Sequence, residues 1–230
     1  MEKMTSREIV SRAIHFRGPP RLPVTMGCFG VDDTGWIGGK PPANWKPSVP
    51  GEDEWGCVWD KTEVENMGQV KGHPLTDLSK QDSFRPPDYD DPSRYVDVAA
   101  SLGAIEAQGK YVISGIFMVL FERMHSLHGF ENTLVGLYEN RAAMEDLADM
   151  VVETHLTQVR AICNRFPGRI DGWCMSDDWG TQTAAFISID MWMDIFFPRY
   201  KRIFDAMHEA GCDVWVHSCG KVNEIVEGYI

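Results

Sequence analysis

Basic residues are scarce in this sequence. Only 22 lysines and arginines stand against 34 aspartates and glutamates in 230 residues, which gives a formal net charge of −12 at pH 7. Binding to nucleic acid or to an anionic lipid surface needs a basic face that neutralises phosphate groups. We therefore expect neither nucleic acid nor a membrane as the main partner.

Long apolar runs and a dense set of cysteines are missing as well. No stretch approaches the roughly 20 uninterrupted apolar residues that a membrane-spanning helix needs. Residues 1–12 mix charges into an amphipathic pattern and show no hydrophobic region of a signal peptide. Six scattered cysteines do not make the disulfide framework of a small secreted domain. These absences predict a cytoplasmic protein.

The first 91 residues contain little regular periodicity. With 43% hydrophobic residues, the chain can bury one core, so we expect a single domain over residues 1–230. A helix is predicted over residues 5–16, capped by Thr5 or Ser6, and a short strand over Leu22–Met26. Residues 30–91 are rich in Gly, Pro, Trp and Asp and predict a loop-rich segment, in which 54–60 is a candidate hairpin strand.

From Pro92 onward the pattern alternates between helix and strand. We predict strands at 110–116, 169–175 and 213–217, and helices at 93–108, 117–129, 130–138, 141–166, 191–210 and 221–229. Such alternation with short connections indicates right-handed βαβ units, and therefore an α/β fold with a parallel sheet. Only four or five strands can be counted, whereas a closed (β/α)₈ barrel usually takes about 250 residues.

The carboxyl ends of parallel strands are where chemistry gathers in such folds. The residues that follow the predicted strands are Cys28 and Phe29, then Glu122, then Asp177, Asp178 and Trp179, and finally His217 and Cys219. The last two clusters carry most of the information. Glu122 is the weaker candidate, because it lies a little way into the following helix.

His217 and Cys219 are two residues apart at a strand end, so both side chains point to one face. Imidazole nitrogen and thiolate sulfur are good zinc ligands, and zinc lowers the pKa of a thiol. The pair therefore predicts part of a metal site. The alternative is a buried histidine with an inert cysteine at a strand-to-helix turn.

Asp177 and Asp178 are adjacent, so their side chains alternate between faces. One carboxylate can point into the mouth of the sheet as an acid, base or hydrogen-bond anchor, while the other caps the following turn. The alternative is that both simply cap a solvated turn. The residues alone leave this choice open.

Several of these segments together resemble a known family. The segment 53–59 followed by 73–75 is similar to the amino-terminal part of uroporphyrinogen decarboxylase-like proteins found in anaerobic methyl-transfer clusters. Further segments then follow in that family's order, namely 176–182, 187–188, Trp192, 198–201, 208–211 and 217–222. The resemblance implies a (β/α)₈ TIM barrel, whose last third is absent from these 230 residues. We expect Cys28, Phe29, Trp179 and Gln182 as substrate contacts.

The resemblance lies on the cobamide-dependent methyltransferase side of the family. That branch moves methyl groups between a corrinoid and a thiol or tetrahydrofolate, and it holds zinc through a His-x-Cys pair and a later cysteine. His217 and Cys219 match the pair, and the third ligand would lie beyond Ile230. The resemblance implies a corrinoid, carried by a partner protein or bound as substrate, or a small-molecule methyl donor. Asp177, Asp178 and Glu122 would then orient substrate or handle a proton.

Two alternatives remain. The first is a decarboxylase-like lyase that acts on a tetrapyrrole, with Asp177 or Asp178 stabilising a protonated pyrrole. True uroporphyrinogen decarboxylases carry an arginine-rich amino-terminal motif, which residues 22–29 lack. The second is a non-catalytic truncated or half barrel that binds a partner chain. An open barrel exposes strand edges, so we expect a homo-oligomer, a completing chain or a fragment of a longer protein.

Overall fold

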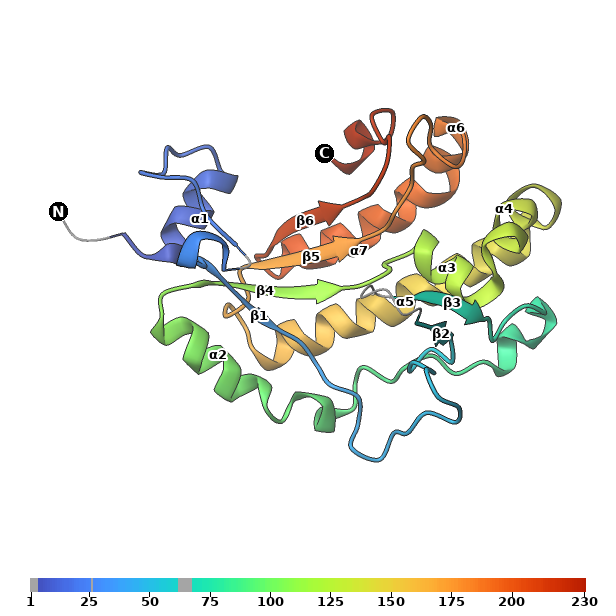
Figure 1. Cartoon of the computed structure of the whole chain (residues 1–230), viewed down its shortest axis with the longest axis horizontal. Helices are drawn as coiled ribbons and strands as arrows, with labels where there is room; N and C mark the ends of the chain where they lie inside the picture. Colours follow the sequence, from blue (N-terminus) through green and yellow to red (C-terminus); the bar gives the residue numbers. More distant parts are fainter. Residues whose placement is uncertain (1–3, 26, 62–67) are drawn as a thin grey trace.

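The chain folds around a four-stranded parallel sheet with helices, which is an α/β arrangement (Figure 1). A computed structural model describes residues 4–25, 27–61 and 68–230, and of Cys28 it describes only the main chain. The strands are β1 (Thr34–Ile37), β4 (Tyr111–Ile116), β5 (Gly172–Ser176) and β6 (Asp213–His217), in the order β1-β4-β5-β6. The parallel pairing of the last three strands confirms the prediction from sequence.

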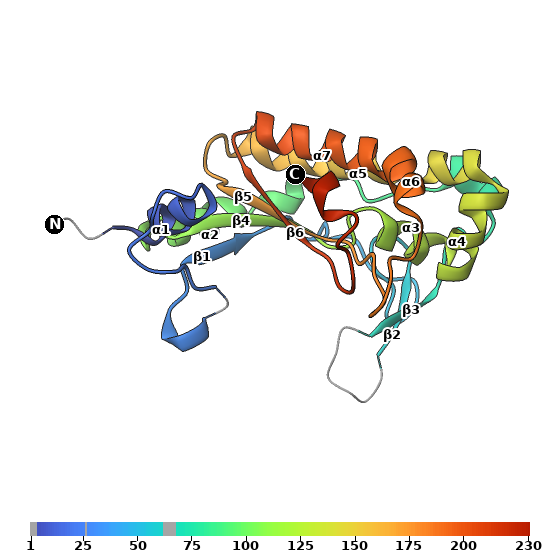
Figure 2. The same cartoon turned by 90° about the horizontal axis from the view of Figure 1, so that it is seen from above.

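The long helices cover one face of this sheet. In Figure 2, α5 (Arg141–Arg165) and α7 (Phe197–Glu209) form a layer over the strands. Alternate strand residues such as Trp173 and Met175 belong to the same buried cluster as the apolar faces of these helices. Helix α2 (Val98–Ala107) contacts β1 and β4. The main core therefore lies between the sheet and its helices.

The opposite face of the sheet is covered at its amino end by α1 (Ser6–Ile14). Its Val10 packs on Tyr111 and Ile113 of β4 in a separate small cluster. The helix begins where the sequence predicts, because Thr5 and Glu8 form a capping box: each side chain bonds to the backbone N–H of the other residue. This end of the sheet is thus closed by a well-capped helix.

The carboxyl ends of the strands point toward a second group of short elements (Figure 1). This group contains the antiparallel hairpin β2 (Val58–Asp60) and β3 (Gln69–Gly72), and the helices α3 (Phe121–His128), α4 (Phe130–Glu139) and α6 (Ile189–Met191). A π-helical turn, Trp192–Phe196, joins α6 to α7. In the described part of the chain there are also 3-10 turns at Cys28–Gly30, Leu78–Ser83, Pro92–Tyr95 and Val226–Tyr229.

Two predicted elements were wrong. Residues 22–25 form no strand, and Met26 lies outside the described residues; the first strand is Thr34–Ile37, inside the segment predicted to be loop. The helix predicted over 221–229 is reduced to the 3-10 turn Val226–Tyr229. Gly35 explains the missed strand, because a Cβ there would lie 2.5 Å from Cγ2 of Ile105 in α2. Close packing of helix on strand requires this glycine, which weakens the strand pattern in the sequence.

The four strands do not close on themselves within the described ranges, so an eight-stranded barrel stays a prediction. Every helix in those ranges is too short or too polar to cross a bilayer.

Candidate active site at the carboxyl ends of β5 and β6

The carboxyl ends of β5 and β6 lie side by side and bring two polar segments together. Ser176 is the register partner of His217, and the Asp177 N–H donates to the His217 carbonyl oxygen at 3.0 Å. One step further along, the Cys219 N–H donates to Asp178 Oδ1 at 2.7 Å. Pairing of the two strands therefore continues into the loops that follow them.

Three side chains converge at this point, and we call Asp178, His217 and Cys219 the Asp–His–Cys group. One ligand atom from each lies within 4.8 Å of the others. His217 Nε2 is 3.4 Å from Cys219 Sγ and 3.6 Å from Asp178 Oδ1. The His217 side chain is 59% exposed and that of Asp178 is 35% exposed. The group is thus compact and open to solvent on one side.

The backbone around the Asp–His–Cys group is fixed by a close approach of two loops. Gly220 has φ +82°, and a Cβ there would lie 2.1 Å from the Gly180 carbonyl oxygen. The Lys221 N–H donates to the Thr181 carbonyl oxygen at 2.8 Å. Only glycine fits at Gly220, because any larger residue would push the loops apart. The two loops that carry the group are therefore held together by main-chain contacts.

Glu122 reaches the group from the first turn of α3. Its Oε2 accepts a hydrogen bond from Ser176 Oγ at 3.2 Å. Burial, and next the Asp178 carboxylate, raise the pKa of Glu122 above its usual range. A half-buried carboxyl group that holds its proton at higher pH than usual suits proton transfer.

Asp177 lies behind the site rather than in it. Its side chain is fully buried and accepts the N–H groups of Phe121 at 2.8 Å and Glu122 at 2.6 Å. It also accepts the hydroxyl of Tyr200. Burial without a cation raises the pKa of Asp177 to about 7. This aspartate fixes the start of α3 and so sets the position of Glu122.

Trp179 is buried in the core behind the same loop. Its ring stacks on Phe121 with centroids 4.3 Å apart, and its Nε1 donates to the Tyr200 hydroxyl at 2.8 Å. Its own N–H donates to Ser218 Oγ at 3.0 Å. Tyr200 and Ser218 were not predicted as site residues. No local pattern marks a helical tyrosine as the partner of a strand-end aspartate, whereas Ser218 does lie between the two candidate ligands.

The other proposed substrate contacts lie in different places. Gln182 is exposed and shares an open hollow of about 630 Å³ with Cys219 and Lys221. The turn Cys28–Gly30 lies at the same end of the sheet as α1, and α3 lies at the opposite end (Figures 1 and 2). Phe29 is 96% exposed there, and the structure describes only the main chain of Cys28. The turn leads into the amino end of β1, because the strand begins at Thr34 and not at Leu22.

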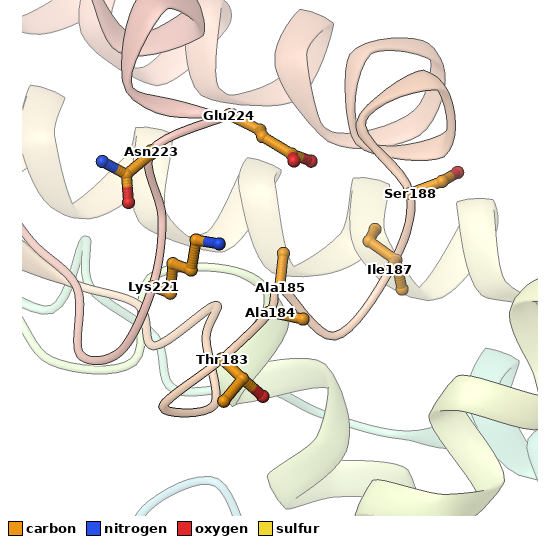
Figure 3. A pocket seen from close by; sticks show the side chains of 8 residues that line it. All are labelled: Thr183, Ala184, Ala185, Ile187, Ser188, Lys221, Asn223 and Glu224. Carbon is orange, nitrogen blue, oxygen red and sulfur yellow. The ribbon is translucent and has the colours of Figure 1, made fainter.

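Two further hollows lie near this end of the sheet. One of about 290 Å³ lies between the two loops, and Figure 3 shows Lys221, Asn223 and Glu224 on one side of it and Thr183, Ile187 and Ser188 on the other. The second is about 490 Å³ and lies between the β2–β3 hairpin and α3. We call it the hairpin pocket. Glu122 is one of its lining residues, so this pocket adjoins the group.

The donor set of the Asp–His–Cys group suits zinc. Imidazole nitrogen, thiolate sulfur and carboxylate oxygen are the three ligand types that zinc takes in proteins. Three protein ligands with an open side match catalytic rather than structural zinc sites, which are closed by four. The Asp178 carboxylate beside Cys219 raises the pKa of that thiol. A cation among the three side chains would reverse this effect and favour the thiolate.

No family model matches the sequence, and no curated protein matches it. Among solved structures, a methyltransferase from Methanosarcina mazei is similar, with a TM-score of 0.53 and 14% sequence identity. The match covers 76% of this chain and 50% of that one, so the chain spans about half the length of the methyltransferase. At this identity the likeness shows a shared fold.

Proposed function

We propose that this chain takes part in methyl transfer, with zinc held by the Asp–His–Cys group. A corrinoid would be on one side of the reaction and a thiol or tetrahydrofolate on the other. The observation that carries the proposal is the convergence of nitrogen, sulfur and oxygen donors within 4.8 Å at the carboxyl ends of two neighbouring strands. The fold shared with the Methanosarcina mazei methyltransferase supports the reaction class.

Each residue of the site has a separate role in this proposal. His217 and Cys219 would bind the metal, and Asp178 would supply the third ligand from within the described chain, where the family resemblance implies a later cysteine. Bound zinc would supply a Lewis acid that keeps a coordinated thiol deprotonated near neutral pH. Glu122, which neighbours Asp178, takes up the proton that the thiol releases.

The proposed transfer balances in atoms and electrons. The sulfur of the thiolate forms a bond to the methyl carbon of a methylated corrinoid, and the carbon–cobalt bond breaks. Both electrons of that bond stay on cobalt, which passes from Co(III) to Co(I), and the products are a thioether and the reduced corrinoid. The thiol proton goes to Glu122. A corrinoid-carrying protein or free methylcobalamin is the proposed partner.

Metal binding tests the proposal without requiring activity. We expect the purified chain to bind one zinc ion, and Co²⁺ in its place to give the near-ultraviolet charge-transfer band of a cobalt–thiolate bond. His217→Ala and Cys219→Ser should each weaken zinc binding by about 100-fold, because each removes a direct ligand. The band should vanish in Cys219→Ser.

Matched controls lie elsewhere in the chain. His208 is an exposed histidine of α7, and Cys174 is a half-buried cysteine of β5. His208→Ala and Cys174→Ser should leave zinc affinity and the cobalt band unchanged. Equal zinc binding by the wild type and both ligand variants would refute the metal site. A methyl-transfer assay with methylcobalamin and a simple thiol then tests the reaction itself.

The lyase alternative fits the charges of the site less well. A tetrapyrrole with several carboxylates needs several cations to bind it. Among the described residues that line the hairpin pocket, Lys71 is the only lysine or arginine, and it is accompanied by Glu122. The pocket therefore matches a ligand with a single negative charge better than a polycarboxylate.

Association with another chain remains part of the proposal. In the described part of the sheet, β1 and β6 are edge strands, each paired on one side only. Exposed parallel edges invite further strands, so a second copy or a completing segment would extend the sheet. Light scattering on the purified chain distinguishes a monomer from such an assembly. A monomer that binds no zinc would favour the non-catalytic alternative.

A further inference from the structure

The hairpin pocket has two apolar, ring-bearing walls. On one side is Trp59 of β2, whose Nε1 donates to Asp53 Oδ2 at 2.9 Å and whose ring stacks on Phe117 at 6.2 Å and 28°. On the other is Phe130 at the start of α4, 41% exposed, with its ring edge-on to His125 at 5.4 Å. Because a hydrogen bond and a stacked ring hold Trp59 in place, this wall is a fixed flat surface.

Two imidazole side chains, His73 and His125, are among the polar groups that line the pocket. His73 Nδ1 lies 2.8 Å from the Ser126 carbonyl oxygen. A carbonyl oxygen only accepts, so Nδ1 carries a proton and donates it in this hydrogen bond. Burial, and next the neighbouring His73, lower the pKa of His125 to about 4, so that imidazole is neutral near pH 7.

The charges at the two ends of the pocket differ. Lys71 of β3 is exposed at the hairpin, and no ion pair involves its ammonium group within the described residues. Glu122 lies at the end that adjoins the Asp–His–Cys group. In a chain of net charge −12, a lysine that forms no ion pair with the described residues is a local attraction for an anion. A negatively charged group therefore fits at the hairpin end and is disfavoured at the Glu122 end.

We propose that the hairpin pocket binds a flat aromatic ligand that carries one anionic group, with the ring beside Trp59 and the anion at Lys71. The pocket volume of about 490 Å³ lies within the range of small-molecule sites. The uncharged end of the ligand then faces Glu122 and the Asp–His–Cys group. The role of this ligand as methyl donor or acceptor rests on the proposed function, whereas its binding does not.

Three small probes separate the contributions of ring and charge. Benzoate has both features, benzamide has nearly the same shape without the charge, and cyclohexanecarboxylate has the charge without a flat ring. We expect ligand-observed NMR on the metal-free chain to show benzoate binding about tenfold more tightly than either control, a difference of about 1.4 kcal/mol. Added salt should weaken benzoate binding and leave benzamide unaffected.

Lysine variants locate the site. Lys71→Gln should lower benzoate affinity about tenfold, toward that of benzamide. Lys61→Gln is the matched control, because Lys61 lines a different hollow of about 630 Å³, which shares only Trp59 with the hairpin pocket. It should leave benzoate affinity unchanged. Trp59→Leu should weaken benzoate and benzamide alike, since it removes the flat wall without removing the charge.

Several outcomes would overturn the inference. Equal affinity for benzoate and benzamide would show that the anionic group does not contribute to binding. A larger loss of benzoate affinity in Lys61→Gln than in Lys71→Gln would show that the ligand binds in the other hollow. Absence of benzoate binding to a folded chain would refute it outright. Benzoate binding by a chain that takes up no zinc would refute the proposed function alone, because the binding measurement uses metal-free protein.

Discussion

Asp33, just before β1 at the amino end of the sheet, and Asp177, just after β5 at the carboxyl end, are both fully buried and differ in their partners. Asp33 receives two hydrogen bonds of 2.6 Å from the Arg21 guanidinium and others from Ser6 and the Val24 N–H. Asp177 receives two backbone N–H groups and a tyrosine hydroxyl, without a cation.

The two aspartates therefore have opposite pKa shifts. The bond from Arg21 holds the pKa of Asp33 well below its usual range, whereas burial raises the pKa of Asp177 to about 7. At the amino end a charge is neutralised and serves stability. At the other end of the sheet, Asp177 has no cationic partner among the described residues. It lies behind the Asp–His–Cys group, whose side chains suit a metal. The two ends of the sheet thus hold a buried aspartate in different ways, with an arginine at one end and with uncharged donors at the other.

The largest expected effect comes from Asp177→Asn, measured as a function of pH. The folded protein holds the Asp177 proton up to about pH 7, whereas the unfolded chain releases it near the ordinary value of 3.8. Raising the pH through this window favours unfolding of the wild type by about 1.4 kcal/mol per pH unit. The asparagine variant lacks this term, so its stability relative to wild type should rise from pH 4 to pH 7.

Urea unfolding at several pH values measures the difference. The asparagine amide of the variant cannot accept every bond that the acid accepts, so the variant should be the less stable of the two at pH 4. A difference that stays constant from pH 4 to pH 7 would mean that Asp177 is ionised throughout, and would remove the contrast with Asp33.

Asp33→Asn should cost about 2 kcal/mol of unfolding free energy at pH 7, because charge-assisted hydrogen bonds are lost. The cost stays moderate since Arg21, 42% exposed, can return to water. The lowered pKa of Asp33 means that this stability is present above the ordinary value of 3.8 and is lost as the pH falls through the folded pKa. Between pH 7 and pH 4 the cost should therefore remain constant, unlike that of Asp177→Asn.

Tyr200→Phe should cost about 1.5 kcal/mol, since it leaves the buried Trp179 Nε1 without its acceptor. The hydroxyl of Tyr200 also lowers the pKa of Asp177, so its removal should raise that pKa further. The pH window of the Asp177 effect would then extend upward. Denaturation of Tyr200→Phe between pH 6 and pH 8 tests this shift, and an unchanged pH profile would show that the two side chains are not coupled.

Arg169→Ala should leave the unfolding free energy nearly unchanged, because surface ion pairs contribute little. Arg169 pairs with Glu106 at 2.7 Å, and the two side chains are 35% and 42% exposed. The pair lies at the amino end, like that of Asp33, and differs from it in exposure. A loss as large as that of Asp33→Asn would show that burial is not what distinguishes these two pairs.

Much of the fold followed from the sequence because periodicity and capping are local properties. The capping box at Thr5 and the strands at 111–116, 172–176 and 213–217 lie where sequence reasoning predicted them, although β5 begins three residues later than expected. The first strand was missed because the decisive contact is distant: Gly35 is needed where Ile105 packs, 70 positions further along the chain. Such a glycine resembles a loop residue when read alone.

The candidate site was predicted in outline for a similar reason. The spacing of His217 and Cys219 places both on one face of a strand end, and the alternation of Asp177 and Asp178 predicts that one points into the mouth. Which of the two does so depends on how β5 meets α3 and α7 in space. The partner that buries Asp177, Tyr200, comes from a helix 23 positions away, and no local pattern marks it. The roles of these residues stay predictions.

The contact between Gly180 and Gly220 has a consequence for how the site opens. Because the backbones touch and the Lys221 N–H bonds across them, neither loop can separate from the other without breaking both contacts. Local opening in proteins proceeds in contiguous cooperative units. The amides of Trp179, Cys219 and Lys221, which all bond across these loops, should then exchange with solvent deuterium at a common rate. Asp178, which follows β5, and Cys219, which follows β6, would thus leave the Asp–His–Cys group together when the loops open, and return to it together when they close.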